Sequence, residues 1–237
     1  MKRGHILALS AIALALMIVV LKQRFTVASL APSALALKPI EAPRRFAEDC
    51  SKVRLAVAKT KVRSISRSIE ALTADEQAIY RAVLLDRSAE GALNVSSRTF
   101  PLDIIGSSND VSDCECLEGM EAGAIVQAAR SYHELAPDLL HDLKARFVSA
   151  DRQADLVRIN DPNNPANKSK SVDHAVRDAF ATGLFSMSEI AFDRDRRHAL
   201  VGFSFWCGGL CGSGSTLRFE KIEGKWKKVH TCGGWIS

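Results

Sequence analysis

Apolar and polar side chains alternate with a period of two over the last fifty residues of the sequence. Between residues 198 and 206, odd-numbered positions fall on one face of an extended chain and even-numbered positions fall on the other. This alternation predicts a half-buried strand. Similar patterns predict three further strands, at about 186–192, 214–222 and 226–235.

These four strands are expected to form an antiparallel meander. The pair Glu223-Gly224 predicts a tight turn between the last two, because glycine accepts the positive φ that a two-residue hairpin needs. One face of such a sheet packs on helices and the other is wetter. We expect the helix-covered face to carry four large apolar residues: Phe203, Phe205, Leu217 and Phe219.

Upstream of the meander, helical spacing dominates. Thr73 and Glu76 form a capping box that predicts a helix start, and the apolar stripe that follows continues to about Asp86. Further helices are predicted at residues 117–134, from Pro137 and from Ser171 or Asp173 through Ala181, and short strands at 92–100 and 156–159. The expected buried stripe of the helix that begins at Pro137 is Leu139, Leu140, Leu143 and Phe147.

This order of elements predicts an α+β fold in which helices pack on a C-terminal four-stranded antiparallel meander. Helices and strands do not alternate regularly, which argues against a doubly wound sheet. We expect a single α+β domain over residues 49–237, helix-rich at 49–182 and sheet-forming at 185–237. That length is enough for one sizeable core.

The N-terminal segment, residues 1–24, has the pattern of a signal anchor or a signal peptide. Residues 5–21 are apolar and, as a helix, approach the thickness of a bilayer. Cleavage after Ala36 would give a secreted protein, but Lys22 and Arg24 lie between the apolar run and that site and favour an uncleaved anchor. Residues 25–48 are rich in Ala and Pro and predict a linker.

Charge gives no support for nucleic-acid binding. The sequence has 32 Lys and Arg against 27 Asp and Glu. Four of the bases and none of the acids belong to residues 1–24, so the remainder is near neutral. We therefore expect contact with a membrane through residues 5–21 and no nucleic-acid partner.

Six cysteines in a chain with an export signal argue for disulfides. Cys207 and Cys211 flank a glycine-rich loop that can fold back on itself, and we expect them to pair. The residues of this loop that could contact a partner are Gly208, Gly209, Leu210 and Gly212. The cysteines that remain as candidates for further disulfides are Cys50, Cys114, Cys116 and Cys232.

Two alternatives for the same cysteines stay open at this point. Cys207, Cys211 and Cys232 with His230 make a Cys₃His set, although structural zinc sites more often show two-residue spacing. Cys207 or Cys232 could also be a nucleophile activated by His230, but no third orienting group is visible. The disulfide interpretation is favoured over both, and no metal or cofactor is expected.

Residues 186–237 carry a "CGGLCG" loop between two strands, a "GKW" hairpin and a "WIS" end. In these features the segment resembles a loose group of uncharacterised bacterial exported or envelope proteins. The resemblance implies a location in the bacterial inner membrane, with the domain on the periplasmic or extracellular side. It implies no reaction.

No nucleophile–base–orienter set or phosphate cradle occurs at workable spacing in the sequence. We therefore expect a non-catalytic domain that binds a protein or a cell-surface component. The alternative is a small exported hydrolase or thiol oxidoreductase that uses Cys207, Cys211 or Cys232 with His230.

Overall fold

The computed structural model describes residues 66–237 apart from residues 69, 90 and 104–115. These residues form an α+β unit around a six-stranded mixed sheet with the strand order β4-β2-β5-β6-β7-β8. The strands are β2 (Leu93–Ser96), β4 (Ala145–Val148), β5 (Leu184–Phe192), β6 (His198–Gly208), β7 (Cys211–Ile222) and β8 (Lys225–Ile236). A separate pair of parallel two-residue strands consists of β1 (Ser66–Arg67) and β3 (Ser131–Tyr132).

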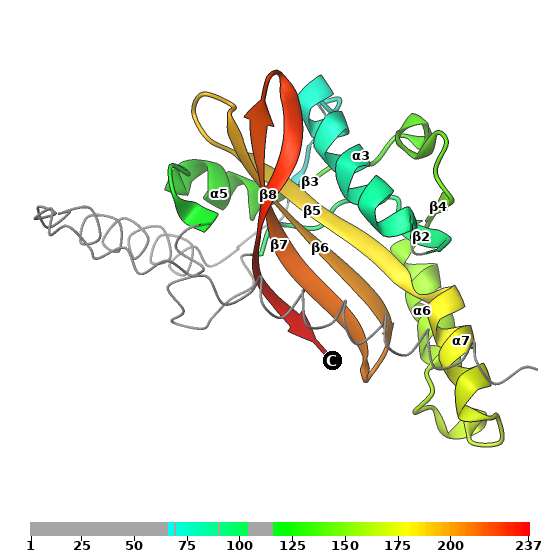
Figure 1. Ribbon diagram of the computed structural model, residues 1–237. Helices are drawn as coiled ribbons and strands as arrows, with labels where there is room; N and C mark the ends of the chain where they lie inside the picture. Colours follow the sequence, from blue (N-terminus) through cyan, green and yellow to red (C-terminus); the bar gives the residue numbers. More distant parts are fainter. Residues whose placement is uncertain (1–65, 69, 90, 104–115) are drawn as a thin grey trace, which may run out of the picture. The chain divides into compact units, whose positions relative to one another are not determined.

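Four α-helices accompany the sheet in the described part of the chain (Figure 1). They are α3 (Ala74–Ser88), α5 (Ala122–Ala128), α6 (Ala150–Asn160) and α7 (Val172–Thr182). Two short 3₁₀ helices, η1 (Pro137–Leu140) and η2 (Pro165–Asn167), lie in the connections.

The predicted meander is present as β5 to β8, and all three of its pairings are antiparallel. The turn between β7 and β8 is formed by Glu223 and Gly224, which both have positive φ values of 52° and 76°. The prediction was incomplete at the other edge of the sheet. There β2 joins β5 in parallel, and β4 joins β2 in parallel, so helices and strands are not segregated along the chain.

Helix α3 covers one face of the sheet and supplies most of the helical side chains of the main core. It begins with the predicted capping box between Thr73 and Glu76. Its buried side chains pack in one cluster with Phe203, Leu217 and Phe219 of the sheet, and Phe205 packs against the edge of that cluster. The predicted assignment of the meander's helix-covered face is therefore confirmed.

The opposite face is less wet than predicted, because α5 and residues 116–120 cover part of it with a second apolar cluster. Figure 1 shows α3 and α5 on opposite sides of the strands. Helix α5 is much shorter than the helix predicted at 117–134. The chain leaves it to form β3, whose backbone pairs with the distant β1.

Two further predictions were wrong. The helix expected from Pro137 lasts for one 3₁₀ turn, and its downstream half is the strand β4. The strand expected at 156–159 is part of helix α6, in which Val157 is fully buried. In contrast, the last predicted helix exists as α7, with Ser171 as its N-cap.

Within the described part of the chain, none of the helices combines the length and the apolar character needed to span a bilayer. The predicted membrane helix at 5–21, the linker at 25–48 and the cleavage site after Ala36 lie outside the described residues.

Candidate functional site

A pocket of about 840 Å³ opens where α3 and α7 end beside the sheet. It is lined by the C-terminal part of α3, the starts of β2 and β4, the last turns of α7, and by residues of β5, β6 and β7. We call it the basic-aromatic pocket after the two kinds of side chain that dominate its lining. The aromatic residues are Phe180, Phe185, Phe203 and Phe205, and the basic residues are Arg87, Lys144, Arg146 and Arg177.

The phenylalanines form the apolar floor and one wall of the pocket. Phe185 and Phe203 are buried, and their rings stack with centroids 5.8 Å apart. Phe205 lies beside Phe180 of α7, with ring centroids 5.7 Å apart, and Phe180 is 56% exposed. Phe180 therefore supplies the accessible aromatic edge of the pocket, and Phe205 lies directly beside it.

The contact between Phe180 and Phe205 depends on Gly183, which follows the last residue of α7. A Cβ atom at this position would lie 2.3 Å from the ring of Phe205. Any side chain at residue 183 would push the ring out of its place against Phe180. The glycine thus lets the helix end close against the strand.

The charged side chains that line the pocket are all of one sign. The described residues that line it include four bases and no acid. Arg87 lies with its guanidinium carbon 4.2 Å from the centroid of the Phe203 ring, a cation–π contact. Lys144, Arg146 and Arg177 form no salt bridge with any described carboxylate.

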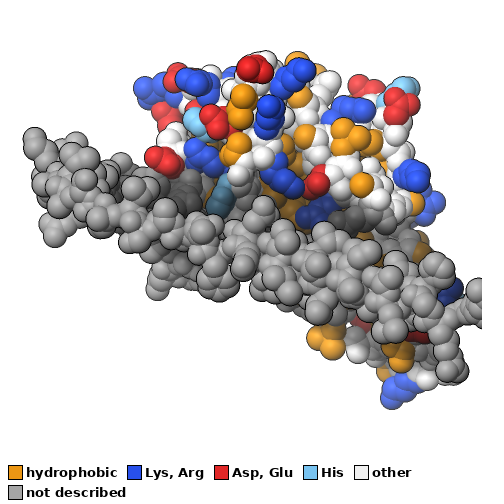
Figure 2. All heavy atoms as spheres, viewed as in Figure 1, with side chains coloured by type: hydrophobic (Ala, Val, Ile, Leu, Met, Phe, Trp, Pro, Cys, Tyr) orange, Lys and Arg blue, Asp and Glu red, His pale blue; other side chains and the backbone are white. Residues whose placement is uncertain are grey.

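Elsewhere on the surface the two signs of charge are mixed. Figure 2 shows Lys and Arg side chains interspersed with Asp and Glu on the visible described surface. Exposed bases outside the pocket commonly have an acidic neighbour, as Lys228 has in Asp86 and Arg158 has in Asp155. The acid-free lining is therefore a local feature of the pocket.

Asn94 of β2 connects the two walls of the pocket. Its amide nitrogen donates hydrogen bonds to the carbonyl oxygens of Ala181 and Gly183, at 3.0 and 3.1 Å. Its side-chain oxygen accepts a hydrogen bond of 2.9 Å from Nε of Arg146. The end of α7 and the basic side chain of β4 are thus fixed to the same buried residue.

The predicted loop between β6 and β7 lies next to this pocket. Cys207 and Cys211 form a disulfide with Cα atoms 5.0 Å apart. Phe205 lies two residues before Cys207, and Ser213 lies two residues after Cys211. Both line the pocket. The disulfide therefore closes the end of a hairpin whose strands form part of the pocket wall.

The tip of the same loop is fixed by a hydrogen bond at one residue and exposes the side chain of the next. Gly209 donates its backbone N–H to the carboxylate of Asp161 at 2.7 Å. Burial alone would raise the pKa of Asp161, but this N–H and the contacts with Asn163 hold the pKa below its ordinary value. Leu210 is 74% exposed.

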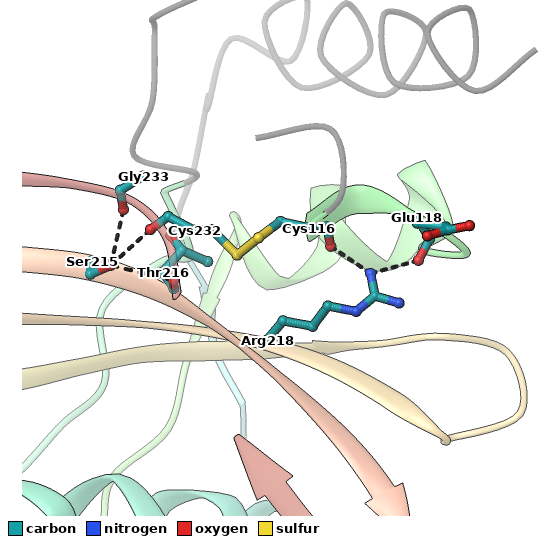
Figure 3. Close-up of a disulfide and its surroundings, with 7 residues drawn as sticks. All are labelled: Cys116, Glu118, Ser215, Thr216, Arg218, Cys232 and Gly233. Carbon is teal, nitrogen blue, oxygen red and sulfur yellow. Dashed lines mark hydrogen bonds between the residues drawn. A yellow bond between two sulfur atoms is a disulfide. The ribbon is translucent and has the colours of Figure 1, made fainter. Parts of the chain in front are cut away.

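A second disulfide joins Cys116 to Cys232 of β8, with a Cα–Cα distance of 5.9 Å. Figure 3 shows it beside Arg218, whose Nη1 donates to the carbonyl oxygens of Cys116 and Glu118 at 2.8 and 2.7 Å. The bond and the arginine together fasten residues 116–118 to the sheet.

The two disulfides occupy the thiols that a zinc site or a cysteine nucleophile would need. Cys207, Cys211 and Cys232 are all bonded to other cysteines, so they offer neither thiolate ligands for zinc nor a free nucleophile. His230 lies opposite Arg218 in the register of β7 and β8. Cys50 and Cys114 lie outside the described residues.

A buried polar cluster surrounds Glu189 of β5. Its carboxylate contacts Nδ1 of His133 at 2.8 Å, the hydroxyl of Thr99, and the hydroxyl of Ser131 at 3.5 Å. Ser131 contacts the carboxylate and not the imidazole, so the three residues do not have the connectivity of a serine nucleophile and its base. The cluster instead ties the segment around β3 to the sheet.

The residues of the pocket were not found from the sequence, except that Phe203 and Phe205 were assigned to the correct face. The four bases come from three separate elements and the connection before β4, and no local spacing links them. The chain matches no protein-family model, no curated protein and no solved structure. The resemblance of residues 186–237 to bacterial envelope proteins therefore stays a prediction.

Proposed function

We propose that the protein is a non-catalytic binding domain that works outside the cytoplasm and holds an amphipathic organic anion in the basic-aromatic pocket. The observation that carries this proposal is the combination of an aromatic floor with four bases and no acid among the described lining residues. Such a lining suits a ligand with an apolar body and a negatively charged head.

The size of the pocket agrees with a small molecule. Its volume of about 840 Å³ lies within the roughly 300–1,000 Å³ that is usual for small-molecule sites. The accessible rings of Phe180 and Phe205 would contact the apolar body. Lys144, Arg146 and Arg177 would surround a carboxylate, sulfonate or phosphate at the opening.

The disulfides and the N-terminal sequence support a proposed location. Two disulfides indicate an oxidising, extracytoplasmic environment. We propose that residues 5–21 anchor the domain in the bacterial inner membrane, with the domain on the periplasmic or extracellular side. The loop Gly208–Gly212, closed by its disulfide and bearing the exposed Leu210, is a surface that a protein or cell-surface partner could contact beside the pocket.

Two fluorescent probes test the pocket directly. 8-Anilinonaphthalene-1-sulfonate and N-phenyl-1-naphthylamine share an apolar body, and only the first carries a sulfonate. We expect the protein to bind the sulfonate at one saturable site per chain, at least about fivefold more tightly than the neutral probe. This ratio corresponds to about 1 kcal/mol, which is the net contribution of an ordinary hydrogen bond.

The variant Phe180→Ser removes an exposed part of the aromatic wall and should weaken both probes about equally. Val172→Ser is the matched control, because Val172 lies on the same helix, is 78% exposed and does not line the pocket. Probe binding that is unsaturable, or that responds equally to both variants, would exclude the pocket as the binding site.

A further inference from the structure

The polar side-chain atoms of Asn94 form their hydrogen bonds almost entirely within the protein. It is 7% exposed, donates to two carbonyl oxygens at the end of α7 and accepts from Nε of Arg146. A buried amide with these partners has little freedom to rotate. Arg146, whose side chain is anchored at Nε, is therefore held in one direction.

The anchored Nε leaves the other end of the Arg146 guanidinium for a ligand. The terminal Nη1 and Nη2 atoms carry N–H groups that point away from Nε in a fixed plane. Arg146 is exposed at the pocket opening and forms no salt bridge with a described carboxylate. This paired geometry matches two oxygens of one oxyanion.

The neighbouring bases do not share this arrangement. Lys144 is a point charge without a planar fork, and it is exposed, as is Arg177. Neither of them is held by a hydrogen bond to a buried described residue. They add positive charge to the opening, whereas Arg146 adds charge and a fixed orientation.

We propose that Arg146 is the specificity-determining residue of the basic-aromatic pocket and binds two oxygens of the ligand's carboxylate or sulfonate head. Asn94 is its positioning residue. This inference rests on the proposed function, because it names the head group of the ligand assigned to that pocket. The ligand class is an organic acid whose apolar body reaches the phenylalanine floor while its acid group stays at the opening.

The variant Arg146→Lys separates charge from geometry. It keeps the positive charge but loses the planar fork, so we expect the Kd for 8-anilinonaphthalene-1-sulfonate to rise about tenfold. The Kd for the neutral N-phenyl-1-naphthylamine should change by less than about twofold. Arg177→Lys at the opening and Arg152→Lys on α6 are matched controls that make the same substitution at exposed positions.

The variant Asn94→Leu tests the positioning role. It removes the acceptor of the Arg146 Nε hydrogen bond without adding a charge, so the affinity for the sulfonate should fall while Arg146 stays positively charged. The ratio of the two affinities is the decisive readout, because general damage to the fold weakens both probes alike. If Asn94→Leu does not fold, Arg146→Lys, which alters an exposed side chain, decides the proposal alone.

The results distinguish this inference from the proposed function. Saturable sulfonate binding with an unchanged Kd in Arg146→Lys would overturn the inference and leave the pocket as a binding site. An equal loss in Arg146→Lys and Arg177→Lys would mean that the anchored Arg146 contributes no more than the unanchored Arg177, which also overturns it. The absence of saturable binding to the unaltered protein would overturn the proposed function and this inference together.

Discussion

The two faces of the sheet are built in different ways. On the face covered by α3, fifteen described residues form one buried apolar cluster, including the fully buried Tyr80 and Phe219. On the opposite face the cluster has nine residues, and two of them are the cysteines of one disulfide. Arg218 adds two hydrogen bonds to the backbone there.

This difference shows how the amount of apolar area decides what else a fold needs. Burial stabilises roughly in proportion to the area removed from water, so the α3 face can rely on packing. The small cluster around α5 offers less area, and a covalent bond with a buried arginine secures the covering segment. The comparison predicts that the two faces respond differently to the loss of side chains and to the loss of crosslinks.

The largest effect is expected from the double variant Cys116→Ala, Cys232→Ala. The bond spans 116 residues, and removing such a long loop constraint should lower the free energy of unfolding by about 5 kcal/mol. The matched control is Cys207→Ala, Cys211→Ala, whose separation is 4 residues and whose cost by the same relation is about 2 kcal/mol. Urea unfolding of the oxidised proteins measures both values.

An equal loss of unfolding free energy in the two double variants would contradict this explanation of the difference between the faces. In that case loop closure would not explain the role of the Cys116–Cys232 bond, and the α5 face would be held mainly by its packing.

The next effect is expected on the α3 face. Leu217→Ala removes a side chain that is 3% exposed within the larger cluster, so the free energy of unfolding should fall by about 3 kcal/mol. Val229→Ala is a suitable control because Val229 is on the neighbouring strand and 44% exposed. A cost below about 0.5 kcal/mol at residue 217 would mean that this face does not depend on close packing.

The smallest effect concerns the polar link between α3 and the last two strands. Asp75 accepts hydrogen bonds from Lys221 and from the indole of Trp226, at 2.7 and 2.9 Å. Burial alone would raise the pKa of Asp75, but these two partners hold the pKa below its ordinary value. Asp75→Asn should lower the free energy of unfolding by about 1 kcal/mol at neutral pH.

The pH dependence of this effect has a definite sign. A carboxylate whose pKa is lowered in the folded state contributes its full stabilisation at pH values above its unfolded-state pKa of about 4. This stabilisation is lost as the pH falls through the lower pKa of the folded state. The difference between the unaltered protein and Asp75→Asn should therefore shrink when urea unfolding is repeated near pH 3. Asp86→Asn, which breaks an exposed pair with Lys228, is the control and should show little effect at either pH. A constant difference at both pH values would exclude the charge of Asp75 as its cause.

The parts of the fold that could be predicted from the sequence are those with local causes. The alternation from residue 198 to 206 and the Glu223-Gly224 turn specify the meander through neighbouring side chains and backbone angles. The hydroxyls of Thr73 and Ser171 similarly mark helix starts, because each satisfies a nearby backbone N–H. These features need no knowledge of distant segments.

The errors occur where a distant segment decides the structure. Leu143 and Phe147 have helical spacing with Leu139, yet residues 145–148 become a strand because β2 offers a parallel partner. Residues 156–159 are rich in branched side chains, but Val157 is buried within a helix that packs near β5 and β6. The pocket was missed for the same reason, since only the folded chain brings Arg146 next to Asn94 and the end of α7.

The Cys116–Cys232 disulfide also sets an order of events during synthesis. Chains are made and exported from the N-terminal end, so Cys116 emerges long before Cys232, which is the last cysteine in the sequence and lies on β8. In the interval, Cys207 and Cys211 emerge together and can close their own short loop. The long bond can form only once the final strand has appeared. Its presence in a sample would therefore mark chains in which β8 has been made and has reached the segment that carries Cys116.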